Sequence, residues 1–335
     1  MTMLVKEEPA ARPDERTALA ISGLNLAIGT GDKAIPLLAD VTVRVGRGET
    51  VGLVGESGSG KSLTARSALG MLPRGARATG NVTVAGADVL AAGRKALRDL
   101  RRTRVAMVFQ DPRASINPVR RVGNYLTEGL RARGMPSRAA TERALDLLDR
   151  VGIRDPRSAM RRFPHEFSGG MLQRVVIAGA LSTEPELLLA DEPTTALDVT
   201  TQAEVIGLLK TMQRERGTGM LFVTHDLDLA AAICDRIYVM YAGRIVEESA
   251  GVSLFRTPAH PYTKALLEAS PSVHGDKVEI KAIRGRPRAL AESPSGCSFR
   301  DRCPLAGDDC VESVPAFRPH KTSLVACLRP EQVTP

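Results

Sequence analysis

A glycine-rich loop between a buried strand and a helix limits the possible folds of this chain more than any other feature. Residues Gly55–Ser62 read GESGSGKS and match the pattern G-x-x-x-x-G-K-[ST]. The apolar run Thr50–Val54 precedes the loop, and a helical pattern over Lys61–Leu72 follows it. Glycines let the backbone turn so that several N–H groups point at phosphates. The loop therefore predicts a nucleotide-phosphate site at the end of a strand in an α/β fold.

Separate positions of this loop have separate expected roles. Lys61 is expected to reach the β- and γ-phosphates, and Ser62 to ligate Mg²⁺. The expected nucleotide-binding residues of the loop are Gly55, Ser57, Gly58, Ser59, Gly60, Lys61, Ser62 and Leu63. Downstream, the buried strand Leu187–Ala190 ends in Asp191, placed to hold Mg²⁺ through water, and Glu192, the candidate general base. These two motifs alone predict a P-loop NTPase.

Further segments resemble the ABC ATPase family. Phe167–Gln173 is similar to the family's signature motif, although Met171 stands where Gln is common. Ser168, Gly169 and Gly170 would open a helix and form a second anion site at its N-terminus. One domain has a single γ-phosphate, already held by its own P-loop. In ABC proteins the second site faces the ATP of a partner domain, so the resemblance implies a dimer with two ATPs at its interface.

Three single residues match other positions of that family. Gln110 resembles the Q-loop glutamine, which senses Mg²⁺ and the γ-phosphate. Asp198 ends an Ala-Leu-Asp run that resembles the D-loop, which crosses the dimer interface. His225 resembles the switch histidine, expected to hydrogen-bond the γ-phosphate and Glu192 in catalysis. The family usually stacks an aromatic on adenine near Ile28; the sequence has none there, so an apolar contact is expected.

Alternating strand and helix patterns predict a mainly parallel sheet covered on both faces. By resemblance, the fold is α/β: a RecA-like P-loop nucleotide-binding core with an antiparallel β-subdomain and an α-helical subdomain at about 112–170. We expect a disordered tail at 1–16, an ABC nucleotide-binding domain at 17–250, and a small Cys-rich C-terminal domain at 251–335. The resemblance itself covers about residues 16–255.

The C-terminal segment resembles that of oligopeptide and dipeptide importers, through His260–Leu267 and Gly296–Pro304. Four cysteines in the spacing C-x5-C-x6-C-x16-C complete the match: Cys297, Cys303, Cys310 and Cys327. In a reducing compartment such a group suggests a metal site rather than disulfides. Four thiolates can bind tetrahedral Zn²⁺ or a [4Fe–4S] cluster. The spacing is wide for structural zinc and the resemblance favours [4Fe–4S], with zinc and unligated thiols as alternatives.

The resemblance implies an ATPase subunit that energises peptide import through an ABC transporter. The partners it implies are a second, homologous ATPase subunit in a heterodimer, two transmembrane permeases, and an extracytoplasmic substrate-binding protein reached through them. The same role in a nickel, opine or glycan importer is an alternative. A more remote alternative is a soluble ABC ATPase that acts on nucleic acid or the ribosome.

Composition supports the first of these interpretations. Aromatic residues are 3% of the chain and Trp is absent, which argues against a stacking platform for single-stranded nucleic acid despite the net charge of +8. No apolar run approaches the roughly 18 residues that span a bilayer. The N-terminal segment has no apolar stretch of the kind found in signal peptides. We therefore expect a peripheral protein at the cytoplasmic face of the cell membrane, without a nucleic-acid partner.

Overall fold

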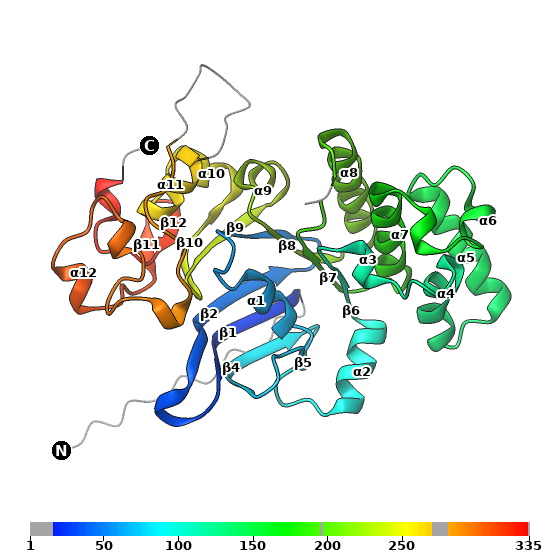
Figure 1. Cartoon of the computed structure of the whole chain (residues 1–335), viewed down its shortest axis with the longest axis horizontal. Coiled ribbons are helices and arrows are strands. Elements are labelled where there is room, and N and C mark those ends of the chain that lie inside the picture. The colour runs from blue at the N-terminus through cyan, green and yellow to red at the C-terminus, as the bar shows by residue number, and fades with distance from the viewer. Residues whose placement is uncertain (1–15, 195–196, 270–280, 334–335) are drawn as a thin grey trace.

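Two β-sheets share one apolar core in the computed structural model, which describes residues 16–194, 197–269 and 281–333 (Figure 1). The smaller sheet is antiparallel, in the order β2-β1-β4-β5. Its strands are β1 (Thr17–Ile28), β2 (Ile35–Gly46), β4 (Ala76–Val84) and β5 (Ala87–Asp88). The expected tail lies outside the described residues, apart from Arg16.

The larger sheet has the order β11-β12-β10-β9-β3-β8-β7-β6 in the described part of the chain. Its strands are β3 (Thr50–Val54), β6 (Val105–Val108), β7 (Leu187–Asp191), β8 (Gly219–Thr224), β9 (Arg236–Tyr241), β10 (Arg244–Ala250), β11 (Arg318–His320) and β12 (Ser323–Val325). The strands from β9 to β6 are parallel, and every residue of β3, β7 and β8 is buried. Such strands are apolar along their whole length because layers cover both faces.

Helices cover this sheet and also form a separate helical layer. They are α1 (Lys61–Ser67), α2 (Arg94–Thr103), α3 (Pro112–Ser115), α4 (Val122–Ala132), α5 (Ser137–Arg150), α6 (Pro156–Ala159), α7 (Gly169–Ser182), α8 (Val199–Arg216), α9 (Leu227–Ile233), α10 (Gly251–Arg256), α11 (Pro261–Ala269) and α12 (Asp309–Glu312). On one face, Ala65 of α1 packs with Val51 and with Val43 of the smaller sheet. On the other face, Leu227 of α9 packs with Phe222. The predicted α/β P-loop architecture is confirmed.

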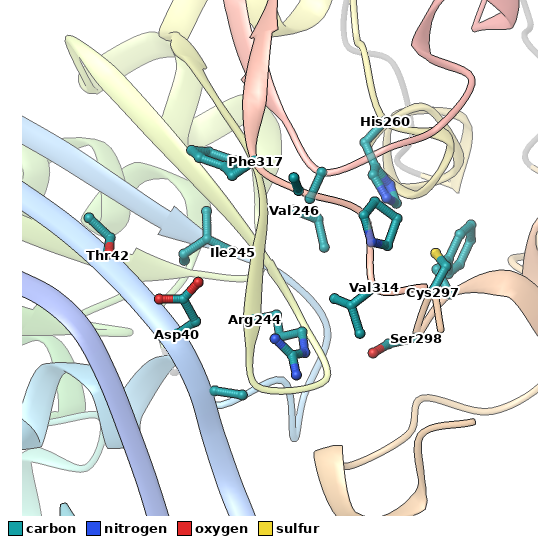
Figure 2. A pocket seen from close by; sticks show the side chains of 15 residues that line it. Asp40, Thr42, Arg244, Ile245, Val246, His260, Cys297, Ser298, Val314 and Phe317 are labelled. Atoms are coloured by element: carbon teal, nitrogen blue, oxygen red, sulfur yellow. The ribbon is translucent and has the colours of Figure 1, made fainter. Parts of the chain in front are cut away.

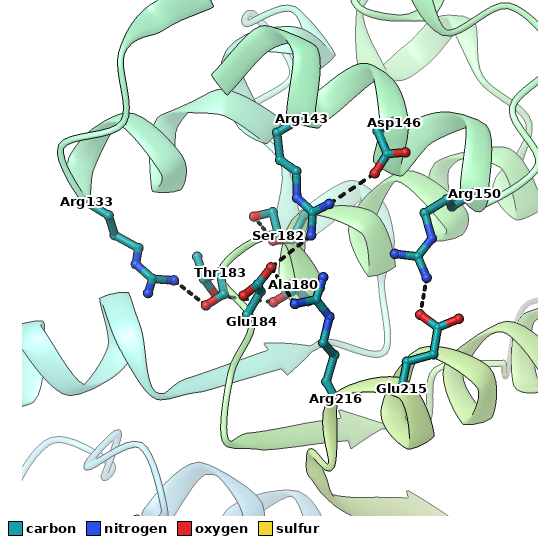
Figure 3. A network of polar contacts seen from close by, with 11 residues as sticks. Arg133, Arg143, Asp146, Arg150, Ala180, Ser182, Thr183, Glu184, Glu215 and Arg216 are labelled. Atoms are coloured by element: carbon teal, nitrogen blue, oxygen red, sulfur yellow. Dashed lines mark hydrogen bonds and ion pairs between the residues drawn. The ribbon is translucent and has the colours of Figure 1, made fainter. Parts of the chain in front are cut away.

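The helical region, residues 112–168, packs on α7 and continues the apolar core of the sheet through it. Exposed ion pairs add polar links beside this contact (Figure 3). Glu184, in the turn after α7, accepts a hydrogen bond of 3.0 Å from Arg143 of α5 and forms an ion pair of 2.8 Å with Arg216 of α8. Arg150 of α5 pairs with Glu215 of α8. Prolines begin α3 and α6, as expected from residues that fix the first turn of a helix.

The C-terminal region, residues 251–333, adds strands to the same sheet. β12 pairs antiparallel with β10, with Glu247 opposite Val325 and Ser249 opposite Ser323. Tyr262 and Phe299 are fully buried in the apolar cluster that contains β9 residues. A separate Cys-rich C-terminal domain is therefore not confirmed: the short strand and the aromatic side chains join this segment to the core.

A cavity of about 250 Å³ remains between β2, the β9–β10 hairpin and the C-terminal region. Figure 2 shows Asp40 and Arg244 on one side of it, and Val314 and His260 on the side of the C-terminal region. None of the helices in the described ranges is long and apolar enough to cross a membrane.

Candidate active site

The P-loop follows β3 and leads directly into α1, as the sequence predicted. Gly58 and Gly60 have φ angles of 82° and 108°, which side chains rarely adopt. A Cβ at Gly60 would lie 2.8 Å from the Leu38 side chain, so only a residue without a side chain fits the packing at this position. The Ser59 hydroxyl is buried and has no hydrogen-bond partner among the residues that the structure describes. The loop thus exposes backbone N–H groups in a tightly packed turn, which suits phosphate oxygens.

Lys61 lies folded over this loop. Its Nζ donates hydrogen bonds to the carbonyl oxygens of Gly55 at 2.7 Å and Glu56 at 2.9 Å. Burial lowers the pKa of Lys61, while the carboxylates of Glu192, Asp191 and Glu56 oppose this shift. These hydrogen bonds therefore hold the ammonium group of Lys61 at the loop that is expected to bind phosphates.

Ser62 and Asp191 meet across the gap between α1 and β7. The Ser62 hydroxyl donates a hydrogen bond of 2.8 Å to the Asp191 carboxylate, and Arg66 lies 3.9 Å from the other carboxylate oxygen. Burial raises the pKa of Asp191, and the Ser62 hydrogen bond and the Arg66 charge oppose this. A hydroxyl and a carboxylate are oxygen donors that Mg²⁺ prefers. The donor set thus fits the Mg²⁺ that the P-loop pattern predicts here.

Glu192 lies immediately beyond β7 and has a strained backbone. Its φ is 47°, a conformation that costs free energy for a residue with a side chain. Its backbone N–H donates a hydrogen bond of 2.9 Å to the carbonyl oxygen of Val223 in β8. Gln110 donates a hydrogen bond of 2.9 Å to the Glu192 carboxylate. His225 Nδ1 lies 3.5 Å from the same oxygen. Three residues far apart in the sequence therefore converge where β6, β7 and β8 end.

The signature segment lies elsewhere in the molecule. Ser168 caps α7, accepting from the Met171 N–H at 3.3 Å, and α7 lies with the helical region, away from α1 (Figure 1). A Cβ at Gly170 would lie 2.7 Å from Thr201, so Gly169–Gly170 also serve close packing of α7 on α8. The helix begins at Gly169 because Ser168 supplies the cap.

Asp198 has a local structural role that the sequence interpretation missed. It caps α8 by accepting from the Thr201 N–H at 3.0 Å and the Thr201 hydroxyl at 2.7 Å. The backbone N–H of Thr201 lowers the pKa of Asp198. An aspartate directly before a helical pattern is a recognised capping signal that could have indicated this role. Ala196, in the same predicted segment, lies outside the described residues.

The four cysteines of the C-terminal region line one small cavity, but their side chains are not arranged as a set of metal ligands. Burial raises the pKa of Cys303 and Cys327 to about 11 and also raises the pKa of Cys297. In the ranges that the structure covers, no three His, Cys, Asp or Glu side chains are arranged to hold a metal ion. The predicted [4Fe–4S] site is thus not supported: the thiols of Cys297, Cys303, Cys310 and Cys327 share a cavity without forming a ligand set.

Two residues of the C-terminal region contact the P-loop at Glu56, and the sequence interpretation missed both. Arg302 forms two hydrogen bonds with the carboxylate of Glu56, at 2.6 and 3.0 Å. The Tyr262 hydroxyl accepts a hydrogen bond of 2.8 Å from the Glu56 N–H. Sequence patterns describe residues that are close along the chain, so none could indicate a contact between residues 246 positions apart.

The fold and this arrangement define a P-loop ATPase of the ABC type. The family described as ABC transporter matches residues 38–195, and the one described as oligopeptide/dipeptide transporter, C-terminal region, matches residues 246–310. The chain belongs to the ATP-binding proteins of ABC transporters, and it is an ATP-hydrolysing subunit of that family. This family membership confirms the resemblance inferred from the motifs.

Two relatives and one solved structure illustrate the similarity. The oligopeptide transport ATP-binding protein OppD of Salmonella typhimurium is 43% identical over 93% of this chain and 93% of its own length. The probable D,D-dipeptide transport ATP-binding protein DdpD of Escherichia coli is 43% identical over 94% of this chain and 97% of its own. A dimeric post-hydrolysis structure of the ATP-binding cassette MJ0796, bound to ADP and Pi, superposes with a TM-score of 0.62 at 28% identity, covering 69% of this chain and 98% of the other.

Proposed function

We propose that this chain hydrolyses ATP to energise the import of oligopeptides or dipeptides through a membrane transporter. The observation that carries the chemistry is the convergence of Gln110, Glu192 and His225 beside the Ser62–Asp191 pair. The choice of peptides rests on the C-terminal match over residues 246–310 and on relatives named for oligopeptide and dipeptide transport. A peripheral position at the cytoplasmic face of the membrane follows from this role.

Each residue of the site has a separate role in ATP hydrolysis in this proposal. The P-loop N–H groups and Lys61 bind the phosphates of ATP, and the oxygens of Ser62 and Asp191 hold Mg²⁺, which supplies positive charge to the phosphates when bound. Glu192 positions the attacking water and accepts its proton. Gln110 orients the Glu192 carboxylate, and His225, close to the same oxygen, would hydrogen-bond the γ-phosphate.

We propose further that a second, homologous ATPase subunit completes each site. Ser168, Gly169 and Gly170 lie with the helical region rather than at α1, so they are free to meet the nucleotide of a partner (Figure 1). Asp198 would contribute to the same interface, while it caps α8. Two transmembrane permeases and an extracytoplasmic substrate-binding protein complete the assembly in this proposal, with no nucleic-acid partner.

The test compares carboxylates at the two ends of β7. In the transporter assembled with its permeases and binding protein, Glu192→Gln removes the proton acceptor and should lower the ATPase rate by about a hundredfold or more. Uptake of labelled peptide into proteoliposomes should fall equally. Glu186→Gln, just before the other end of β7, should leave both rates near wild type. An unchanged ATPase rate in Glu192→Gln would show that another group is the base.

The cysteine cavity supports a further, separate proposal. We propose that Cys297, Cys303, Cys310 and Cys327 bind a [4Fe–4S] cluster, because all four thiols line one cavity although they do not form a ligand set in this structure. Thiolates must lose their protons to bind metal, so binding would have to lower the raised pKa values. Anaerobic purification followed by iron and sulfide assays tests this. One equivalent of zinc without iron, or no metal at all, would contradict it.

A further inference from the structure

Glu56 places a carboxylate inside the P-loop, at a position that the P-loop pattern leaves free. Arg302 pairs with this carboxylate through both terminal nitrogens, at 2.6 and 3.0 Å. The Arg302 side chain is 4% exposed and that of Glu56 is 19% exposed. A bidentate pair of this kind is stronger and better oriented than an exposed ion pair. The C-terminal region therefore contributes a largely buried charge to the edge of the phosphate site.

Several contacts fix Arg302 in this place. Its Nε donates a hydrogen bond of 2.7 Å to the carbonyl of Arg284. Its guanidinium lies 5.7 Å from the ring centre of Tyr241 and 5.9 Å from that of Phe299. Burial would lower the pKa of Arg302, but hydrogen bonds to Glu56 raise it overall. The guanidinium is therefore charged and immobile before any nucleotide binds.

Tyr262 holds the backbone at the same residue. Its hydroxyl accepts the Glu56 N–H at 2.8 Å, and its ring packs 5.3 Å from the ring of Phe299 and 4.7 Å from that of Tyr241. Tyr262 is fully buried. Side chain and main chain of Glu56 are thus both bound by the C-terminal region, which fixes the start of the loop.

The charge of Glu56 acts on the phosphate site itself. Glu56 is one of three carboxylates that raise the pKa of Lys61 against the effect of burial. An unpaired carboxylate this close to Lys61 would also repel the negative charge of a triphosphate. Arg302 cancels that repulsion, so its loss should weaken nucleotide binding.

We propose that Arg302 and Tyr262 are positioning residues for ATP binding, Arg302 by neutralising Glu56 and Tyr262 by fixing its backbone. The inference rests on the proposed function only in requiring that ATP binds at the P-loop. It makes the C-terminal region a part of the nucleotide site. Nucleotide affinity would then depend on a residue adjacent to Cys303 in the sequence.

The test measures the affinity of the full-length chain for the magnesium complex of a non-hydrolysable ATP analogue, by calorimetry. Arg302→Met keeps much of the side-chain stem and leaves Glu56 unpaired, which should raise Kd about tenfold. Glu56→Gln combined with Arg302→Met removes both charges and should return Kd to within about twofold of wild type, as expected if the repulsion is electrostatic. The increase in Arg302→Met should shrink at high salt.

Matched variants separate this effect from disturbance of the C-terminal region. Arg288 forms a 3.0 Å ion pair with Asp301 in the same region, and Arg288→Met should leave Kd unchanged. Tyr262→Phe frees the Glu56 N–H and should raise Kd by about threefold, less than the loss of the charge. Circular dichroism checks that each variant is folded.

Two results would overturn the proposal. One is wild-type affinity in Arg302→Met; the other is a double variant that binds as weakly as Arg302→Met. Should Arg302→Met fail to fold, the double variant alone still decides, because weak binding without the Glu56 charge contradicts an electrostatic role. Lys61→Ala should abolish binding whether or not the proposal holds, so a failure of nucleotide binding at the P-loop is recognised separately.

Discussion

The helical region and the C-terminal region are joined to the same core by polar contacts of opposite character. The contacts of the helical region are more exposed: in the pair between Arg143 of α5 and Glu184, the two side chains are 24% and 47% exposed. The contact between Glu56 and Arg302 is largely buried and lies among aromatic rings. Exposed ion pairs contribute little to stability, whereas breaking a buried one leaves an uncompensated charge.

This difference indicates what each region is free to do. The helical region can shift relative to β7 and α8 at small cost in polar contacts, because water replaces them. The C-terminal region cannot shift without exposing Phe299 and unpairing Glu56. We therefore expect the C-terminal region to move with the P-loop as one body, while the helical region adjusts its orientation when nucleotide binds.

The largest expected effect comes from Phe299→Ala, which tests the C-terminal attachment directly. Phe299 is 1% exposed and packs against Tyr241 and Tyr262, so truncation leaves a cavity. It should lower the free energy of unfolding by about 3–5 kcal/mol. Urea denaturation followed by circular dichroism measures this. A loss below about 1 kcal/mol would mean that the ring is not essential to the attachment.

An intermediate effect is expected from acid, through His260. Burial lowers the pKa of His260 to about 3, from 6.5 in a free side chain. The free energy of unfolding that depends on neutral His260 is therefore fully present above about pH 6.5. It decreases as the pH falls toward 3, by up to about 1.4 kcal/mol per pH unit. Hydrogen exchange of α11 amides from pH 7 to 4 should detect this local loss. His260→Gln should flatten the dependence; equal slopes in both proteins would exclude His260 as the cause.

The smallest effect is expected at the helical region. Glu184→Gln removes the charge that Arg143 and Arg216 share, and should cost less than about 1 kcal/mol of stability at low salt. In 0.5 M NaCl the difference from wild type should disappear, because these side chains are exposed. Thermal denaturation at both salt concentrations provides the measurement. A large loss of stability that does not depend on salt would show that the ion pairs of Glu184 contribute as much as the buried Glu56–Arg302 pair, contrary to our inference.

Local patterns predicted most of the core and most of the candidate site. The P-loop and the end of β7 each depend on a few adjacent residues. The roles of Gln110 and His225 were predicted from the family resemblance, and the parallel strands β6, β7 and β8 bring these residues to Glu192 because their carboxyl ends meet at one edge. Predicting these features requires only residues that are adjacent in the sequence, or the regular geometry of a parallel sheet.

Contacts between distant segments could not be predicted in this way. Glu56 and Arg302 are 246 residues apart, and neither sequence pattern requires the other. β11 and β12 have three residues each, too few for a recognisable alternation. The attachment of the C-terminal region therefore emerged only from the structure.

The pairing of β12 with β10 has a consequence for biosynthesis. Until Ser323–Val325 leaves the ribosome, β10 is the last strand on its side of the sheet and its outer backbone groups lack their partner. Unpaired edges of this kind favour association with other chains. The nascent protein thus carries a complete P-loop but an uncovered sheet edge while the final segment is translated, at about 5–20 residues per second. A nonsense mutation shortly before Ser323 would make that transient edge permanent.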